Sequence, residues 1–149
     1  MAIARGAGTE IIRSIHVAGI ADTAKPLIYG VQHHIYTVLS VIVEAQALNA
    51  DGDWINMYLL GYDSNPGTTG HNLHIFKQDM SVAETFVWND KFSFNGYEPI
   101  DFTGPVDSEA KQDAIADQGS SVRQILYIDA EHASDNFDVI CTFIDQNNA

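Results

Sequence analysis

The sequence predicts an all-β fold: an antiparallel β-sandwich of jelly-roll type with about eight strands, one short peripheral helix and an extended N-terminal arm. Three observations predict it. Runs of alternating apolar and polar residues recur along the chain, turn-forming residues interrupt these runs about every ten residues, and one segment alone has a helical composition. The 149 residues, 46% of them hydrophobic, suffice for one domain with a buried core, so we assign 1–149 to a single domain.

The most regular alternation runs from His34 to Ala47, where β-branched residues reinforce the strand prediction. Residues at alternate positions share one face of this predicted strand: Ile35, Thr37, Leu39, Val41, Val43, Ala45 and Ala47. The polar segment 49–53 has the composition of a turn, and residues 54–62 form a second apolar run. We therefore expect a long antiparallel hairpin over 34–62, with a second sheet covering its apolar surface.

The remaining elements follow from similar patterns. Residues 1–8 are small and glycine-containing, which predicts an extended arm. Further strands are expected at 9–17, 27–29 and 73–77, and further hairpins at 84–94 and 122–144. Residues 107–118 are the predicted helix, because Asp107 or Ser108 can cap its start, alanines favour it and Gly119 can end it.

The net charge of −13 narrows the choice of partners. Seven Lys and Arg residues against twenty Asp and Glu residues are the wrong balance for binding nucleic acid or an anionic membrane surface. No apolar run approaches the roughly 18 residues of a membrane span, and the first residues lack an apolar core of signal-peptide length. Three cations and two acids give residues 1–25 a net charge of +1, which suits docking to an acidic partner; chance is the alternative explanation.

The sequence carries no motif for catalysis, so we expect a protein that is not an enzyme and has no cofactor or bound metal. His71 and His74 would point to opposite faces of a strand, and no cysteine pair accompanies the six histidines. The acidic segment 51–53 lacks the remaining ligands of a calcium loop, so a hairpin tip is the simpler interpretation. Cys141, the one cysteine, lies in an apolar alternating run, where we expect a buried and unreactive thiol.

Five segments carry a resemblance to known proteins: ARGAGTEIIR at 4–13, GVQHHIYTVL at 30–39, WNDKFSFNGYEP at 88–99, ADQG at 116–119 and FIDQNN at 143–148. Through them the chain resembles small virion proteins of marine tailed phages. The resemblance implies a structural role in the virion, foremost as a capsid decoration (cement) protein on the lattice of the major capsid protein, assembled in the host cytoplasm. It also implies a trimer and supplies no catalytic residues. A tail or head–tail connector component is the alternative within this group.

The arm is the predicted partner-binding segment. Its candidate residues are Ile3, Arg5, Thr9 and Arg13, which could lie across the lattice or a sister subunit. Binding would come from buried apolar area and strand pairing, with charge setting the orientation.

A carbohydrate-binding β-sandwich module is the alternative outside the virion class. It requires Trp54 or Trp88 to be exposed in a groove as a stacking platform for sugars. Aromatic residues in strands are more often core residues, which is the competing interpretation of both tryptophans.

Overall fold

The computed structural model describes residues 9–31, 34–60, 72–96, 108–109 and 123–147. The strands in these residues are β1 (Thr9–Ile20), β2 (Lys25–Tyr29), β3 (His34–Ala47), β4 (Trp54–Leu60), β5 (Asn72–Asp79), β6 (Thr85–Trp88), β7 (Phe92–Asn95), β8 (Ile125–Ala130) and β9 (Asn136–Asn147). Two predicted elements lie outside the described residues: the arm at 1–8, and the helix at 107–118 apart from Ser108 and Glu109. None of the described residues belongs to a helix long and apolar enough to span a membrane.

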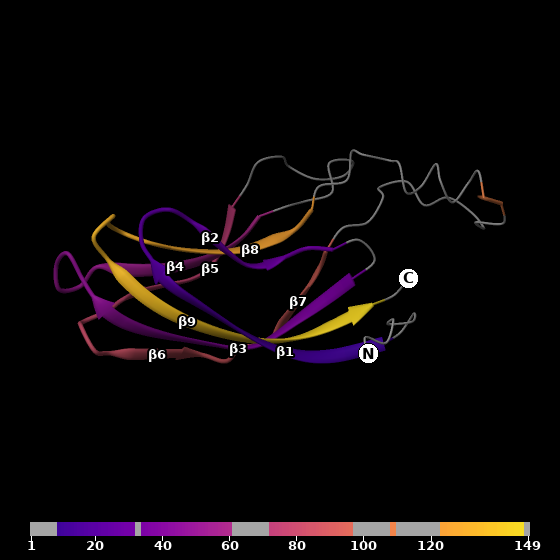
Figure 1. The fold of residues 1–149 in the computed structure, drawn as a ribbon, viewed down its shortest axis with the longest axis horizontal. Coiled ribbons are helices and arrows are strands. Elements are labelled where there is room, and N and C mark those ends of the chain that lie inside the picture. The colour runs from indigo at the N-terminus through magenta and orange to yellow at the C-terminus, as the bar shows by residue number, and fades with distance from the viewer. Residues whose placement is uncertain (1–8, 32–33, 61–71, 97–107, 110–122, 148–149) are drawn as a thin grey trace.

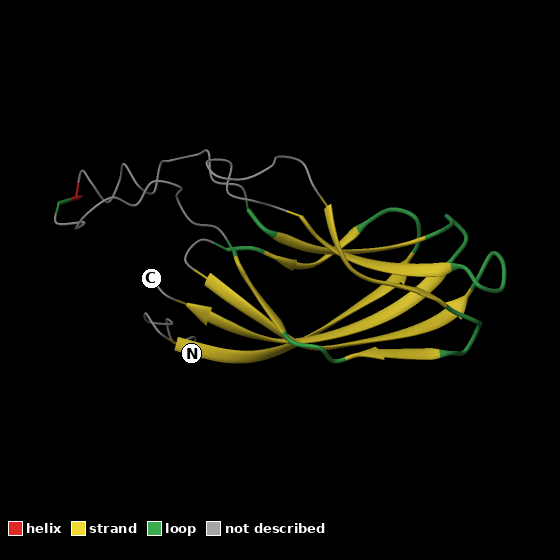
Figure 2. Ribbon diagram, turned by 180° about the vertical axis from the view of Figure 1, so that it is seen from behind, coloured by secondary structure: helices red, strands yellow, loops and turns green. Residues whose placement is uncertain are grey.

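The strands form two antiparallel sheets that lie face to face as two layers (Figure 1). Sheet A has the order β1-β9-β3-β6, with β7 also paired to β3, and sheet B has the order β2-β8-β4-β5. Figure 2 shows the same two layers from behind. The predicted antiparallel β-sandwich is therefore confirmed.

Nested strand pairs identify the sandwich as a jelly roll. β1 pairs with β9, β2 with β8, β3 with β6 and β7, and β4 with β5, so the chain is one long hairpin rolled up across two sheets. β6 pairs with residues 41–44 of β3 and β7 with residues 35–38, so they are two halves of one interrupted strand. The nine strands thus occupy eight positions, which agrees with the predicted strand number.

The three predicted hairpins are wrong in their pairing. β3 and β4 lie in different sheets, as do β8 and β9, and β6 and β7 follow one another along β3 instead of pairing. Alternation reports that one face of a strand is buried, but it does not identify the neighbouring strand. The connections 48–53 and 131–135 are also longer than the two-residue turns that enforce a hairpin, so they can cross from one sheet to the other.

A β-bulge overturns the predicted facing of the first half of β3. In its register with β9, Leu39 is one extra residue between Val38 and Ser40. The alternation therefore restarts one position later, and the two faces of the strand swap. The buried residues on either side of the bulge are Tyr36, Val38, Val41, Val43 and Ala45. Ile35 and Thr37, which the prediction placed on the same face as Val41, lie on the opposite face.

A second bulge, at the end of β1, directs the last residue of that strand, Ile20, into the core. Two residues, Ala18 and Gly19, stand where β9 has one, and Gly19 has a φ of 67°, in the left-handed region that favours glycine. The ammonium group of Lys25 donates hydrogen bonds to the carbonyl oxygens of both residues, at 2.9 and 3.0 Å. Beyond the bulge, Ile20 is fully buried.

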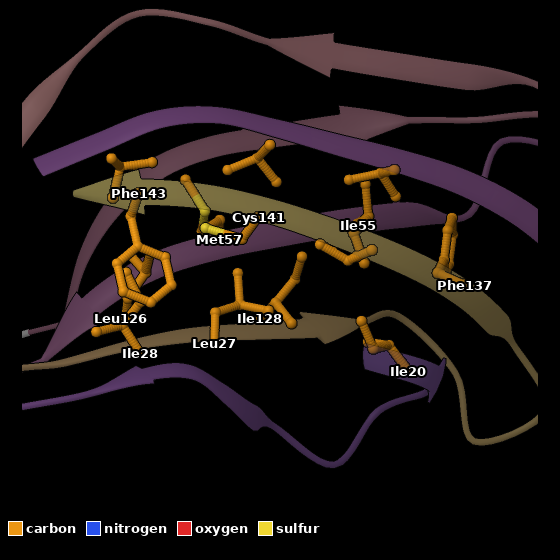
Figure 3. Packing of buried hydrophobic residues seen from close by; sticks show 14 of the residues in the cluster. Ile20, Leu27, Ile28, Ile55, Met57, Leu126, Ile128, Phe137, Cys141 and Phe143 are labelled. Carbon is orange, nitrogen blue, oxygen red and sulfur yellow. The ribbon is translucent and has the colours of Figure 1, made fainter. Parts of the chain in front are cut away.

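The core fills the space between the two sheets (Figure 3). Its residues come from the inner faces of both sheets: Val38, Val41, Val43, Phe137, Val139, Cys141 and Phe143 of sheet A, and Leu27, Ile28, Ile55, Met57, Leu126 and Ile128 of sheet B. Fully burying one large apolar side chain is worth about 1.5–3 kcal/mol. Burial of these two inner faces is therefore what holds the layers together.

A chain of aromatic rings joins the sheets at the edge formed by β5, β6 and β7. The ring centroid of Trp88 lies 6.3 Å from that of Phe76 on β5 and 5.5 Å from that of Phe92 on β7. The chain continues from Phe92 to Phe94 and from Phe94 to Tyr36, with centroids 6.0 and 5.4 Å apart. Because β5 belongs to sheet B and the other strands to sheet A, Trp88 packs between the layers.

Replacing Phe137 with alanine tests how strongly the packing of the sheets depends on one core side chain. Phe137 is fully buried, so we expect Phe137→Ala to leave a cavity and lower the free energy of unfolding by about 3–5 kcal/mol. Chemical denaturation measures this change. Ile140→Ala on the same strand is the control, because Ile140 is 44% exposed and its loss should change stability by less than about 1 kcal/mol. Equal effects of the two substitutions would contradict the facing of β9.

Candidate partner-binding surface

The outer face of sheet A carries half of the exposed large hydrophobic side chains in the described part of the chain. Of ten such side chains, five lie here: Ile12, Ile35, Ile42, Val87 and Ile140. Strand alternation points them outward, because their neighbours along β3, β6 and β9 pack into the core. Ile12, on β1, is the most exposed of them at 71%.

The strand register aligns these side chains into rows. Val87, Ile42 and Ile140 lie opposite one another on β6, β3 and β9. A neighbouring row carries hydroxyl groups, in which Oγ of Ser14 lies 2.9 Å from Oγ1 of Thr142. These rows contain no lysine or arginine. An apolar, hydroxyl-bearing face on a protein with a net charge of −13 has the composition of an interface core.

An open depression of about 140 Å³ lies in this face, lined by His16, Ile42, Glu44, Thr85, Asp138 and Ile140. Glu44 and Asp138 are directly opposite each other in the register of β3 with β9. Nε2 of His16 lies 3.9 Å from Oδ2 of Asp138. Like charges opposite each other on a sheet destabilise it, and a cation on a partner would relieve that repulsion. The depression therefore fits an apolar side chain accompanied by a lysine or arginine.

The outer face of sheet B carries a hydrogen-bonded polar network beside aromatic rings, among them the stacked pair Tyr58 and Tyr127. Nδ2 of Asn56 donates a hydrogen bond to Oδ1 of Asp129 at 3.0 Å, and Nδ1 of His74 lies 2.7 Å from Oδ1 of Asn56. Nζ of Lys77 lies 4.5 Å from the ring centroid of Trp54. Burial raises the pKa of Asp129 above its ordinary value, although Asn56, His74 and Lys77 oppose that rise. These groups partner one another within the chain, which suits a face directed at solvent.

The predicted partner-binding residues are divided between undescribed and described parts of the chain. Ile3 and Arg5 lie outside the described residues. Thr9 begins β1, where it is opposite Asn147 of β9. Arg13 lies in the same strand, and its side chain is half exposed. The structure therefore places Thr9 and Arg13 on an edge strand of the sandwich instead of on a separate arm.

Asp145 engages the charge of Arg13 within the chain. This carboxylate is 2% exposed, and its Oδ2 lies 3.7 Å from Nη1 of Arg13. Its Oδ1 lies 2.6 Å from Nδ1 of His34. The Arg13 guanidinium also lies 5.8 Å from the ring centroid of Phe143. Arg13 thus stabilises the inner face of sheet A, and its use in binding a partner remains a prediction.

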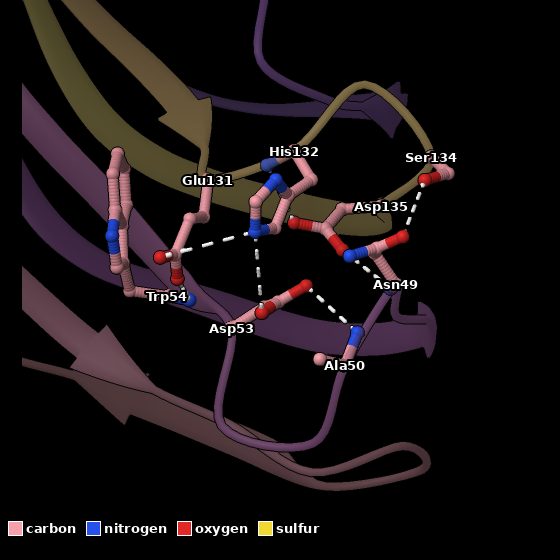
Figure 4. Close-up of polar contacts among 8 residues, drawn as sticks. All are labelled: Asn49, Ala50, Asp53, Trp54, Glu131, His132, Ser134 and Asp135. Carbon is pink, nitrogen blue, oxygen red and sulfur yellow. Dashed lines mark hydrogen bonds and ion pairs between the residues drawn. The ribbon is translucent and has the colours of Figure 1, made fainter.

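The connections β3–β4 and β8–β9 meet in an acidic cluster (Figure 4). Oδ2 of Asp53 accepts a hydrogen bond from the backbone N–H of Ala50 at 3.0 Å. The carboxylate of Asp135 accepts from the backbone N–H groups of Asn49 and His132, at 2.8 and 2.9 Å. Asp53 and Asp135 are 5% and 4% exposed. Both acids therefore cap turn backbone, and Asp135 ties the two connections together.

The two buried carboxyl groups of this cluster also face each other. Burial raises the pKa of Asp53 above its ordinary value, and the hydrogen bond and charge of Asp135 raise it further. The backbone N–H of Ala50 and the nearby His132 oppose this rise. At neutral pH the ionised form of Asp53 is therefore disfavoured relative to the unfolded chain.

Three side chains of the cluster have atoms of the kind that bind metals. One ligand atom from each of Asp53, Glu131 and His132 lies within 4.8 Å of the others. A structural zinc site uses four protein ligands, and calcium takes six to eight oxygens. The turn hydrogen bonds of Asp53 and Asp135 already account for their burial, so we assign the cluster the role of joining two connections.

Cys141 is buried, as predicted. It is fully enclosed in the core, and burial raises the pKa of its thiol to about 12. A thiol with this pKa is not a thiolate at neutral pH, so it is unreactive.

One feature of the sequence indicates the apolar outer face of sheet A, although the strand predictions above did not include it. Ile42 and Ile140 each occupy a position on the otherwise polar side of an alternating run. An isoleucine there points outward if the strand has one buried face, and two such residues on paired strands make a patch. The acidic cluster had no comparable signal, because nothing in the sequence brings the connections 48–53 and 131–135 together.

Comparisons with known proteins assign no family. No protein-family description and no curated protein matches the sequence. Among solved structures, a chain from the work titled "Bacillus endospore appendages form a novel family of disulfide-linked pili" is similar with a TM-score of 0.42 and 13% identity, over 100% of this chain and 97% of that chain. A chain from the "Structure of infectious bursal disease virus Gx strain" is similar with a TM-score of 0.40 and 8% identity, over 95% of this chain and 32% of that chain. Similarities this distant do not assign a function.

Replacing Asp53 with asparagine tests the acid pair. A carboxyl whose folded-state pKa is raised stabilises the fold at low pH, and that contribution is lost as the pH rises through the raised pKa. Asp53→Asn keeps an oxygen for the Ala50 N–H and removes the repulsion from Asp135. We therefore expect the variant to be more stable than the wild type at pH 7, with the difference shrinking as the pH falls towards 3.8, the ordinary value of the carboxyl pKa.

Denaturant unfolding at a series of pH values measures this difference. Asp51→Asn is the matched control, since it removes one negative charge from an exposed side chain of the same turn. It should give no comparable gain at pH 7. A less stable Asp53→Asn variant at pH 7 would mean that the ionised carboxylate stabilises the turns.

Proposed function

We propose that this chain is a structural protein that binds other proteins, and specifically a capsid decoration (cement) protein of a tailed phage that binds the lattice of the major capsid protein. The observation that carries the binding role is the outer face of sheet A, with its aligned row of Val87, Ile42 and Ile140. The resemblance of the sequence to small virion proteins supports the choice of partner. The proposed location is the virion.

The size of this face supports a specific interface. Four strand positions spaced by about 4.8 Å, each with about ten residues rising 3.3 Å apiece, give a face of about 600 Å². A standard protein–protein interface buries about 800 Å² on each partner. The face thus supplies most of the area of one stable contact.

The chemistry of the face describes the partner surface. An apolar patch on the capsid lattice would cover the isoleucine row, and a lysine or arginine beside it would reach Glu44 and Asp138 at the depression. The hydroxyl row formed by Ser14 and Thr142 can accept or donate hydrogen bonds at the same contact.

The rest of the molecule suits the outside of a particle. The polar network of sheet B would face solvent, and a net charge of −13 would make decorated particles repel one another. The alternative location on the tail or at the head–tail connector uses the same face. It differs in copy number, because cement follows the capsid lattice and a tail component follows the tail axis.

Charged substitutions on the outer face of sheet A test the proposal. Ile42→Lys and Ile140→Lys should each weaken binding to capsids of the source phage that have been stripped of this chain by tenfold or more, because a buried unpaired ammonium opposes the contact. Co-sedimentation with the capsids measures the binding. Both side chains are exposed, so the variants should unfold at about the wild-type temperature.

The matched control is Leu73→Lys, because Leu73 is also an exposed hydrophobic residue, at 55%, but lies on β5 of sheet B. It should bind capsids as the wild type does. The proposal fails if the wild type does not bind the stripped capsids, or if Leu73→Lys weakens binding as much as the sheet A variants.

A further inference from the structure

We propose that β1 is a pairing edge to which β1 of a second copy of this chain adds antiparallel, making a two-fold dimer with one continuous sheet. The inference goes beyond the capsid-binding role and does not rest on it. It rests on a comparison of the four edges that the two sheets present in the described part of the chain.

Three of the edges carry features that prevent strand addition. β2 has only five residues, it contains Lys25 and Pro26, and its register with β8 shifts after Pro26. β6 and β7 have four residues each, and the segment 89–91 interrupts them. β5 carries Lys77, and its register with β4 shifts between Met57 and Tyr58.

The edge at β1 is longer and more regular, although it carries Glu10 and Arg13. β1 has twelve residues without a proline or a lysine. It pairs with β9 in unbroken register from Thr9 to Val17, and its bulge is confined to the end beyond Val17. Among the described residues no other strand pairs with it. A long, regular edge of this kind is a template for another strand, and β-strand addition is a recurrent mode of protein association.

The side chains of β1 favour a second copy as the occupant. In an antiparallel pair, residues directly opposite each other share a face, so a two-fold axis through the sheet must pass beside a residue that opposes itself. Centring the pair on Ile12 sets the two Ile12 side chains against each other, and Ile12 is 71% exposed in the single chain. The same register places Glu10 opposite Ser14 and Ile11 opposite Arg13, so no like charges meet.

The two neighbouring registers are less favourable. Centring on Ile11 sets a less exposed side chain (38%) against itself and places the charged Glu10 opposite Ile12. Centring on Arg13 would place two guanidinium groups directly opposite each other, which destabilises a sheet. The register centred on Ile12 therefore has the better cross-strand pairs. It also joins the outer faces of sheet A from both copies into one surface, with Ile12 continuing the apolar rows across the boundary.

The dimer has a predictable salt dependence. Each copy has a net charge of −13, so the copies repel each other while the pairing edge itself contributes backbone hydrogen bonds and apolar contact. Added salt screens the repulsion and should tighten the dimer. Capsid binding through Glu44 and Asp138 should weaken with salt instead, which keeps the two interactions distinguishable.

Light scattering on the full chain tests the proposal. At about 100 μM, a dissociation constant of about 10 μM or tighter would leave most of the protein as a dimer with twice the 16.3 kDa chain mass. Ile12→Lys should raise the dissociation constant at least tenfold, because two ammonium groups would face each other across the axis. Val87→Lys, an exposed residue on the same face at the opposite edge, should leave the dimer unchanged.

Cysteine cross-linking tests the register directly. Oxidised Ile12→Cys should form a disulfide-linked dimer, because residues opposite each other in an antiparallel pair have Cβ atoms about 4.5–5.5 Å apart. Val87→Cys should not form a disulfide-linked dimer, and Cys141 should not react because it is buried. The proposal is overturned if the wild type is a monomer at this concentration, if it is the trimer implied by the resemblance, if Ile12→Lys dimerises with the wild-type dissociation constant, or if Ile12→Cys cross-links no faster than Val87→Cys. None of these outcomes bears on capsid binding, which depends on Ile42 and Ile140.

Discussion

Sheet A is held together by β9, which lies between β1 and β3 and pairs with both. Among the described strands β1 pairs only with β9, so β9 alone connects β1 to β3 and to the rest of sheet A. β9 also supplies the inner-face residues Phe137, Val139, Cys141 and Phe143, which pack against sheet B. The last strand of the chain thus completes a sheet that its first strand begins. Pairing of this kind closes long loops, so the fold is expected to form slowly and cooperatively.

The difference between the two outer faces follows from the same arrangement. β9 and β3 lie in the middle of sheet A, and each places an isoleucine on the outside where an alternating strand normally carries a polar residue. β4 and β8 lie in the middle of sheet B, and their outward groups include the bonded side chains of Asn56 and Asp129 and the stacked rings of Tyr58 and Tyr127. An acidic molecule with an apolar row on one outer face is suited to contact a protein on that face, where Glu44 and Asp138 would attract a cation of the partner. The proposed function and the proposed dimer both use this asymmetry.

The fold class could be predicted from the sequence, because alternating apolar and polar residues reflect the local geometry of a strand, in which successive side chains point to opposite faces. Each run with one buried face was recognisable, as in 34–47 and 137–144, and their number and spacing indicated a sandwich. Strand pairing was not recognisable, because a buried face does not identify its neighbour, and the three expected hairpins were wrong for that reason. The bulge at Leu39 could not be predicted either. Val38 and Leu39 are both apolar, so either could face the core, and only the register with β9 shows that Leu39 is the extra residue.

The candidate sites, like the fold, could be predicted from the sequence only where they depend on local patterns. The outward isoleucines could be located from the sequence, but their alignment into a row depends on which strands pair. Arg13 was predicted to bind a partner, and the buried Asp145 that engages its charge is 132 positions further along the chain, beyond the reach of local patterns. The buried pair of Asp53 and Asp135 is equally non-local, because its two connections are about 80 positions apart in the sequence and meet only when β3 pairs with β9 and β4 with β8.

The proposed binding mode can be seen in an image of capsids to which this chain has been bound, at a resolution that separates the two sheets. We expect many copies on the capsid lattice, with the outer face of sheet A against the shell and the outer face of sheet B towards solvent. Density that places sheet B against the shell, or that leaves the row of Val87, Ile42 and Ile140 open to water, would contradict this binding mode.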